Sequence, residues 1–287
     1  MIRVRSFLIP ACAVAAFGVI GTASAADLTS AGYYQDFSSL GTGTSLATNT
    51  PEWTYWSEAG EHSWGSGGVV PASGVAAMSQ VNQSTTKMSV LTALPAANSN
   101  ADSVNGYNAA LSLVDPGAPA ASRIIATGPT GDAGVAWQLT LTNNTGSALT
   151  DINISYDIAE LHNSTQSGQP AAPDESPGYQ LFYSTDGSTW ANVAALNPQP
   201  TNPNGPVVPN GVGLTPVGLY DLTFANAVAN GSSFELRWVD PNGTANSDEM
   251  VGLTDVSVAP VPLPAGLPLL VSALGGLGLF CRRRKAA

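Results

Sequence analysis

In the stretch Val135-Ala136-Trp137-Gln138-Leu139-Thr140-Leu141 every second side chain is apolar, and the pattern returns in Ile152-Asn153-Ile154-Ser155-Tyr156-Asp157-Ile158. A two-residue period is typical of a β-strand with one buried face. Between the two runs, Asn143-Asn144-Thr145-Gly146 has the composition of a turn. We therefore predict an antiparallel hairpin that packs its apolar face on a core.

Similar short runs, separated by Gly, Pro, Asn and Asp, continue along the chain, whereas no long stretch has the 3.6-residue period of an amphipathic helix. We expect further strands at 179–184, 190–196, 219–224, 234–239 and 253–258. For residues 41–121 we expect one or two strands, surface loops and an ordered excursion over one sheet. The predicted fold is all-β: a two-sheet antiparallel sandwich of jelly-roll type, with an N-terminal signal helix and a C-terminal transmembrane helix outside it.

The first 25 residues have the features of a secretory signal peptide. Arg3 and Arg5 precede an apolar run, and the small residues Ala23 and Ala25 form a cleavage site for signal peptidase. The exported body is then residues 26–259.

Residues 260–287 form a second targeting segment. It begins with the motif Val261-Pro262-Leu263-Pro264-Ala265, and its uncharged run to residue 281 is long enough to cross a bilayer. The run is followed at once by the cations Arg282, Arg283, Arg284 and Lys285. Cations at this position favour retention on the cytoplasmic side, which leaves the body outside the inner membrane.

This tail resembles a known sorting signal. The motif at 261–265, the apolar span and the basic end are similar to the VPLPA variant of the PEP-CTERM signal of Gram-negative bacteria. The resemblance implies that a membrane enzyme of the exosortase type recognises the motif and cuts near it. The protein would then pass from an inner-membrane intermediate to the cell surface or the extracellular matrix.

The body is similar, in scattered blocks, to secreted bacterial β-sandwich domains that occur in PEP-CTERM proteins. The blocks are Phe37-Ser38-Ser39-Leu40-Gly41-Thr42 and the segments 143–147, 154–156, 183–190, 236–240 and 255–258. In place of the family's usual Gly-Glu-Gln-Trp-Arg after the Ser-Tyr strand, this chain has Ile158-Ala159-Glu160-Leu161-His162. The resemblance implies a jelly roll without a known catalytic constellation.

Composition argues against several functions. In the body, three basic residues, Lys87, Arg123 and Arg237, stand against 20 acidic residues, a net charge of −17. We therefore expect no binding of nucleic acid through its phosphates. Arg237 lies in an otherwise apolar strand, and we expect it to pair with a carboxylate. The two cysteines, Cys12 and Cys281, lie in the signal peptide and the tail, so the body has no thiolate for catalysis or zinc binding.

We expect the protein not to be an enzyme. The only histidines are His62 and His162, and no Gly-x-Ser-x-Gly elbow accompanies either of them. We interpret His162 as a surface-loop residue. Carboxylates of the kind used in glycoside hydrolysis are Glu52, Glu58, Glu61, Asp157 and Glu160. The expected function is a non-catalytic structural or adhesive sandwich, and an extracellular hydrolase is the third alternative.

The second alternative is a carbohydrate-binding module. Trp53, Tyr55, Trp56 and Trp64 lie close together in the sequence and could form a platform on which the rings of a polysaccharide stack. The other interpretation of these four residues is that they pack onto the sandwich.

We expect no cofactor, and the one exception that we consider is a hypothetical calcium site. The first and last strands of a jelly roll often pair, which would bring Asp36 beside Asp255. The loop that follows residue 239 adds oxygen donors at Asp240, Asn242 and Asp248, and Ca²⁺ prefers oxygen ligands. The other interpretation is a polar turn in which Asp255 caps backbone amides.

Overall fold

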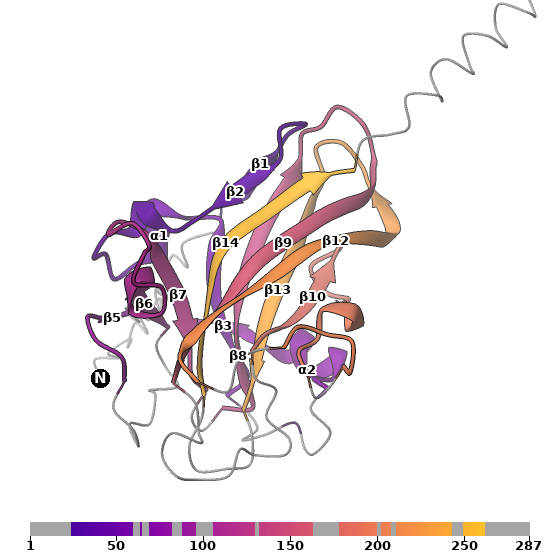
Figure 1. Ribbon diagram of the computed structural model, residues 1–287. Coiled ribbons are helices and arrows are strands. Elements are labelled where there is room, and N and C mark those ends of the chain that lie inside the picture. The colour runs from indigo at the N-terminus through magenta and orange to yellow at the C-terminus, as the bar shows by residue number, and fades with distance from the viewer. Residues whose placement is uncertain are drawn as a thin grey trace, which may run out of the picture.

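The computed structural model describes residues 24–59, 64, 69–81, 88–95, 106–129, 132–162, 178–199, 202–207, 211–242 and 249–261 (Figure 1). The strands are β1 Ala26–Leu28, β2 Tyr33–Gln35, β3 Trp53–Ser57, β4 Ser79–Gln80, β5 Ser89–Leu91, β6 Tyr107–Ala110, β7 Arg123–Thr127, β8 Gly134–Asn143, β9 Leu149–His162, β10 Gln180–Ser184, β11 Ala191–Asn192, β12 Gly213–Val228, β13 Ser233–Pro241 and β14 Met250–Pro260. The helices are α1 Leu46–Asn49 and α2 Ala72–Ala77, with 3-10 turns η1 Ser38–Leu40, η2 Leu111–Leu113 and η4 Ala194–Leu196. Within these ranges no helix is long and apolar enough to cross a membrane, and the predicted signal and transmembrane helices fall outside them.

The strands form two sheets that pack face to face, as an all-β sandwich requires (Figure 1). The first sheet has the order β11-β10-β13-β8-β3-β4, with β1 beside β8, and the second has the order β12-β9-β14-β7-β6-β5, with β2 beside β14. Most pairs are antiparallel, but β1 with β8 and β5 with β6 are parallel. The sandwich is therefore rich in antiparallel pairs without being purely antiparallel. From β8 to β10 and from β12 to β14, consecutive strands alternate between the two sheets.

The predicted hairpin is wrong, because β8 and β9 lie in opposite sheets. β8 pairs with β13 and β3, whereas β9 pairs with β12 and β14. The connection between them crosses from one sheet to the other, a distance of about 10 Å. Asn143 supports the crossing: its Nδ2 donates to the carbonyl oxygens of Ser147 at 2.8 Å and Val228 at 2.9 Å, and its Oδ1 accepts the N–H of Thr145 at 3.1 Å.

The main core lies between the sheets and consists of the inward side chains of the long strands. Trp53 of β3 and Trp238 of β13 pack with ring centroids 5.4 Å apart, and Tyr156 of β9 meets Trp238 edge-on at 5.7 Å from the opposite sheet. All three side chains are at most 1% exposed. Burial of an aromatic side chain of this size stabilises a fold by about 1.5–3 kcal/mol, which makes these rings a central part of the core.

An ordered excursion covers the outer face of the first sheet, as expected for part of residues 41–121. Val75 of α2 and Met78 just after it pack on Phe182 of β10 and Val239 of β13. The same region holds four strands, β3 to β6, instead of the one or two expected. The later strands fall where the alternation predicts them, except that β11 is short and gives way to η4, and β12 is longer than expected.

The long strands run between two ends of the sandwich, called here the loop end and the tail end. At the loop end β9 and β13 finish and β14 and β8 begin, with Met250 opposite His162 and Pro241 opposite Gly134. At the tail end β8 finishes, β9 begins and β14 finishes at Pro260.

Candidate functional site

The four aromatic residues of the predicted sugar platform are not gathered on one surface. Trp53 and Tyr55 are 0% and 4% exposed in the core, so their rings are not available to a ligand, and the packing interpretation holds for both. Trp56 and Trp64 are partly buried against the α2 layer. The Trp64 ring lies directly over Gly134, where an added Cβ would come within 2.4 Å of it. No row of sugar-binding rings therefore forms from these four residues.

Arg237 of β13 lies between two tryptophan rings on the outer face of the first sheet. Its guanidinium carbon is 4.1 Å from the ring centroid of Trp56 and 4.0 Å from that of Trp190. Its Nε and Nη2 donate to Oε1 of Gln138, and its Nη1 donates to the carbonyl oxygen of Val75 at 2.6 Å. The expected carboxylate does not accept a hydrogen bond here, since an amide and a backbone oxygen accept these protons, but the charge of Glu235 acts on Arg237 and partly opposes the fall of its pKa. Burial lowers the pKa of Arg237 to about 9, so this tryptophan clamp holds a desolvated cation.

The first strand, β1, pairs with β8, but the second strand, β2, pairs with the last strand, β14. Gln35 lies opposite Val256, which brings Asp36 beside Asp255. Oδ1 of Asp36 accepts the backbone N–H of Ser38 at 3.0 Å and the hydroxyl of Ser38 at 2.8 Å. The backbone hydrogen bond lowers the pKa of Asp36. Asp36 is thus a turn-stabilising carboxylate on the outer face of the second sheet.

Asp255 lies at an irregularity of β14. Its φ of 51° is in the left-handed region, and the pairing of β14 with β9 shifts register between Thr254 and Ser257. The hydroxyl of Tyr34 donates to Oδ1 of Asp255, and this hydrogen bond raises the pKa of Tyr34. Burial, and then the charge of Asp255, raise the pKa of Asp157 on β9. The hydrogen bond to Asp255 and the charges of Asp255, Asp36 and Asp157 thus all act on the hydroxyl of Tyr34.

The remaining predicted calcium ligands lie elsewhere. Asp240 accepts the hydroxyl of Thr127 at 2.7 Å at the loop end. Thr127 pairs with the start of β14, about four residues or ~13 Å along the strand from Asp255. Asn242 is also at the loop end, where its Nδ2 donates to a backbone carbonyl at 2.7 Å, and Asp248 lies outside the described residues. In the described part of the chain, no group of three or more His, Cys, Asp or Glu side chains is placed to hold a metal ion.

A buried polar network at the loop end was not predicted from the sequence. The hydroxyl of Tyr179 donates to the carbonyl oxygen of Val251 at 2.9 Å and lies 2.9 Å from Oγ1 of Thr127, which in turn donates to Asp240. Burial, and then the charge of Asp240, raise the pKa of Tyr179. The network ties β7, β13 and β14 together, and no periodic pattern in the sequence marks its members.

Two glutamates and a histidine lie beside this network. His162 is 2% exposed at the end of β9, so its interpretation as a surface-loop residue is wrong. Glu160 is fully buried on the same strand, and Glu249, 5% exposed, directly precedes β14. Burial, and then the charge of Glu160, raise the pKa of Glu249 to about 8. Only the pairing of β9 with β14 brings these residues together.

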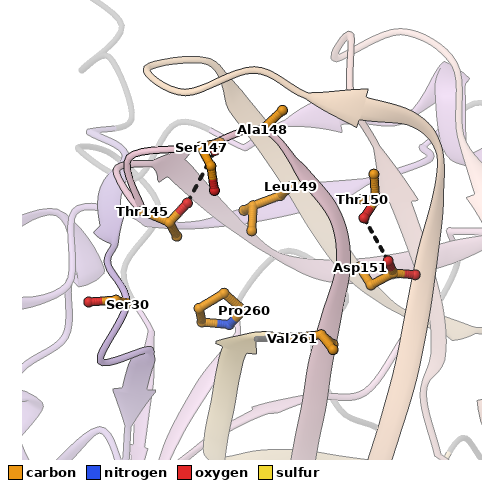
Figure 2. A pocket seen from close by; sticks show the side chains of 9 residues that line it. All are labelled: Ser30, Thr145, Ser147, Ala148, Leu149, Thr150, Asp151, Pro260 and Val261. Carbon is orange, nitrogen blue, oxygen red and sulfur yellow. Dashed lines mark hydrogen bonds between the residues drawn. The ribbon is translucent and has the colours of Figure 1, made fainter. Parts of the chain in front are cut away.

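The tail end has a shallow pocket of about 220 Å³, shown in Figure 2. Pro260 and Val261 form its floor, and residues of the β8–β9 connection, such as Thr145, form the opposite side (Figure 2). The N–H of Val261 points to the carbonyl oxygen of Asp151 at 3.4 Å. The pairing of β14 with β9 thus extends to the first residue of the predicted sorting motif.

The other predicted processing residues are described only in part. Ala25 directly precedes β1, and the N–H of Ser24 donates to the carbonyl oxygen of Pro51 at 3.1 Å. Outside the described residues are Ala23, Pro262, Leu263, Pro264, Ala265, Arg282, Arg283 and Arg284. No protein-family model and no curated protein matches this chain.

Proposed function

We propose that this chain is an exported protein that is sorted to the cell surface or extracellular matrix of a Gram-negative bacterium. There its body acts as a non-catalytic structural or adhesive β-sandwich of jelly-roll type. The alternation of consecutive strands between the two sheets supports the jelly-roll assignment.

The extent of the folded body is the observation that carries the proposal. The first strand begins at Ala26, the residue after the proposed signal-peptidase site, and the last strand ends at Pro260, the residue before the sorting motif. Among the described residues of the two targeting segments, only Pro260 lies in a strand, as the last residue of β14, and neither segment contributes a side chain to the buried core. Both segments can therefore be removed without taking a packed side chain from the sandwich.

The proposed route has two processing steps. Signal peptidase cuts after Ala25, and the apolar span with its basic end then holds the protein in the inner membrane with the body outside. An exosortase-type enzyme acts near the motif that begins at Val261. Val261, the first residue of this motif, lies at the tail end of the sandwich.

A deletion of residues 261–287 tests this proposal in a Gram-negative host that has the sorting enzyme. We expect the full chain to lose its tail and to reach the surface, and the deleted chain to be secreted without passing through a membrane-bound form. Cell fractionation and mass spectrometry of the C-terminal peptide measure both outcomes.

A matched variant, Pro262→Ala with Pro264→Ala, keeps the span and the cations but changes the motif. We expect it to accumulate uncut in the inner membrane. If it were processed and displayed like the full chain, the sorting proposal would be refuted.

A further inference from the structure

The charges of the body are distributed unevenly along the chain. From Gly187 to Phe234 the only charged residue is Asp221, although the body as a whole has 20 acidic residues and three basic ones. This uncharged stretch contains β11, η4 and β12. One part of an otherwise strongly acidic molecule thus has almost no charge.

In the fold, this stretch occupies one lateral side of the sandwich. β11 is the last strand of the first sheet and β12 the last strand of the second. The two sheets meet there, because the hydroxyl of Tyr183 on β10 accepts the N–H of Ala225 on β12 at 3.3 Å, and its ring packs edge-on against Phe224 at 5.6 Å.

The β12 edge differs from the other sheet edges in length. β11, β4 and β5, at the other ends of the two strand orders, have 2, 2 and 3 residues, and β1 and β2, which also pair on one side only, have 3 each, whereas β12 has 16. Short edge strands protect a sheet from pairing with another chain, and a long one leaves a row of unpaired N–H and C=O groups. In the described part of the chain, β12 pairs only with β9.

Features that usually block an open edge are few on β12. It has no Lys or Arg and one acidic residue, and its interruptions are Pro216 and two register shifts. Three of the large exposed apolar side chains lie on or beside it: Val207, Val212 and Leu219, the last 72% exposed. The hydroxyl of Thr215 donates to the carbonyl oxygen of Val207 at 3.4 Å, so Val207 borders the strand.

We propose that this edge pairs with the same edge of a second copy of the chain, β12 antiparallel to β12 about a two-fold axis. The acidic surfaces of two copies repel each other, most strongly at low ionic strength. The side that has almost no charge is therefore where two copies can approach. An open edge requires a partner with an extended strand, and the other copy supplies one. Antiparallel pairing of a strand with itself is self-complementary, as a closed two-fold dimer requires. The proposal does not depend on the sorting route.

Cysteine cross-linking tests the proposal in the full chain. The body has no cysteine, so replacing both native cysteines with serine gives a thiol-free background. Leu219→Cys or Thr223→Cys then places one thiol on the β12 edge, and Ser89→Cys places one on β5, at the opposite edge of the same sheet. With a short bifunctional thiol reagent we expect covalent dimers from a β12 position and none from Ser89→Cys. Monomers from both β12 variants, or equal dimer yields from Ser89→Cys, would overturn the proposal.

Sedimentation of the detergent-solubilised full chain gives an independent measurement. Leu219→Asp adds a like charge to the edge and is expected to weaken self-association at least tenfold, since like charges on neighbouring strands are unfavourable. Val69→Asp, on the α2 side, is the matched control and should leave it unchanged, because Val69 is likewise exposed. Asp221→Asn removes the only charge of the edge and should strengthen self-association. A full chain that stays monomeric at every concentration, or equal weakening by both aspartate variants, would refute the inference.

Discussion

Arg237→Met tests how much the tryptophan clamp stabilises the sandwich. Methionine keeps an apolar chain between Trp56 and Trp190 but loses every donor of the guanidinium. Hydrogen bonds from a charged donor contribute about 1.5–3 kcal/mol, and each cation–π contact about 0.5–2 kcal/mol. Removing the buried cation offsets part of this lost stabilisation. The lowered pKa of Arg237 shows that burial disfavours its charged form, and the variant no longer has this cost. We expect a net loss of about 2–4 kcal/mol in the free energy of unfolding, much of it from the oxygens of Gln138 and Val75 left without donors.

Denaturant unfolding of residues 26–261, followed by tryptophan fluorescence, measures this loss, and the melting temperature should fall by about 5–15 °C. Arg237→Lys keeps the charge without the planar fork and should give an intermediate loss. Adding Gln138→Met to Arg237→Met removes the stranded amide, and we expect the double variant to regain about 1 kcal/mol over Arg237→Met alone. Two results would contradict the stabilising role of the clamp. One is a free energy of unfolding of Arg237→Met within about 0.5 kcal/mol of that of the unmodified protein. The other is a loss in the double variant equal to the sum of the losses from Arg237→Met and Gln138→Met alone.

Three further outcomes are expected. Burial raises the pKa of Glu249 to about 8, above its ordinary value of 4.5, so the stability from its protonated form should be complete below about pH 4.5 and lost as the pH rises through 8. Thermal melts from pH 4 to 9 would show this fall, and Glu249→Gln should flatten it. Gly252→Ala should cost about 1–3 kcal/mol in a urea titration, because its Cβ would lie 2.1 Å from a methyl group of Ile124, whereas Gly218→Ala, with open space around it, should change stability little. Millimolar calcium should leave the melting temperature unchanged, and a rise that Asp255→Asn abolished would instead reveal a metal site.

The sequence was sufficient to predict an all-β sandwich and the buried faces of β8 and β9, but not the partners of the strands. Alternation in Val135–Leu141 and Ile152–Ile158 shows which side chains face a core. It carries no information on which strand lies alongside, so a turn that crosses between sheets has the same composition as one that closes a hairpin. The parallel pairs of β1 and β5 and the short strands between residues 41 and 121 are set by packing on the long strands rather than by local pattern.

The same limit explains which site residues could be predicted. The neighbourhood of Asp36 and Asp255 followed from a general rule on terminal strands and was found. Arg237 lies opposite Gln138 in the register of β13 and β8, and without that register a carboxylate is the natural partner to expect. Glu160 and Glu249 come together only because β9 pairs with β14, and their residue types alone do not indicate it.

β9 also sets a length scale for the molecule. Its first residue, Leu149, lines the pocket beside Val261, and its last residue, His162, lies at the loop end; 14 residues at ~3.3 Å each span about 45 Å. If the chain is held through Val261, as proposed, its loop end lies up to about one and a half hydrocarbon-core thicknesses from the point of attachment. At physiological salt this is about five Debye lengths, so the charge of such a surface would be screened from the carboxyl group of Glu249. The raised pKa of Glu249 would then depend on burial within the fold, and it would be the same in a surface-held and in a released chain.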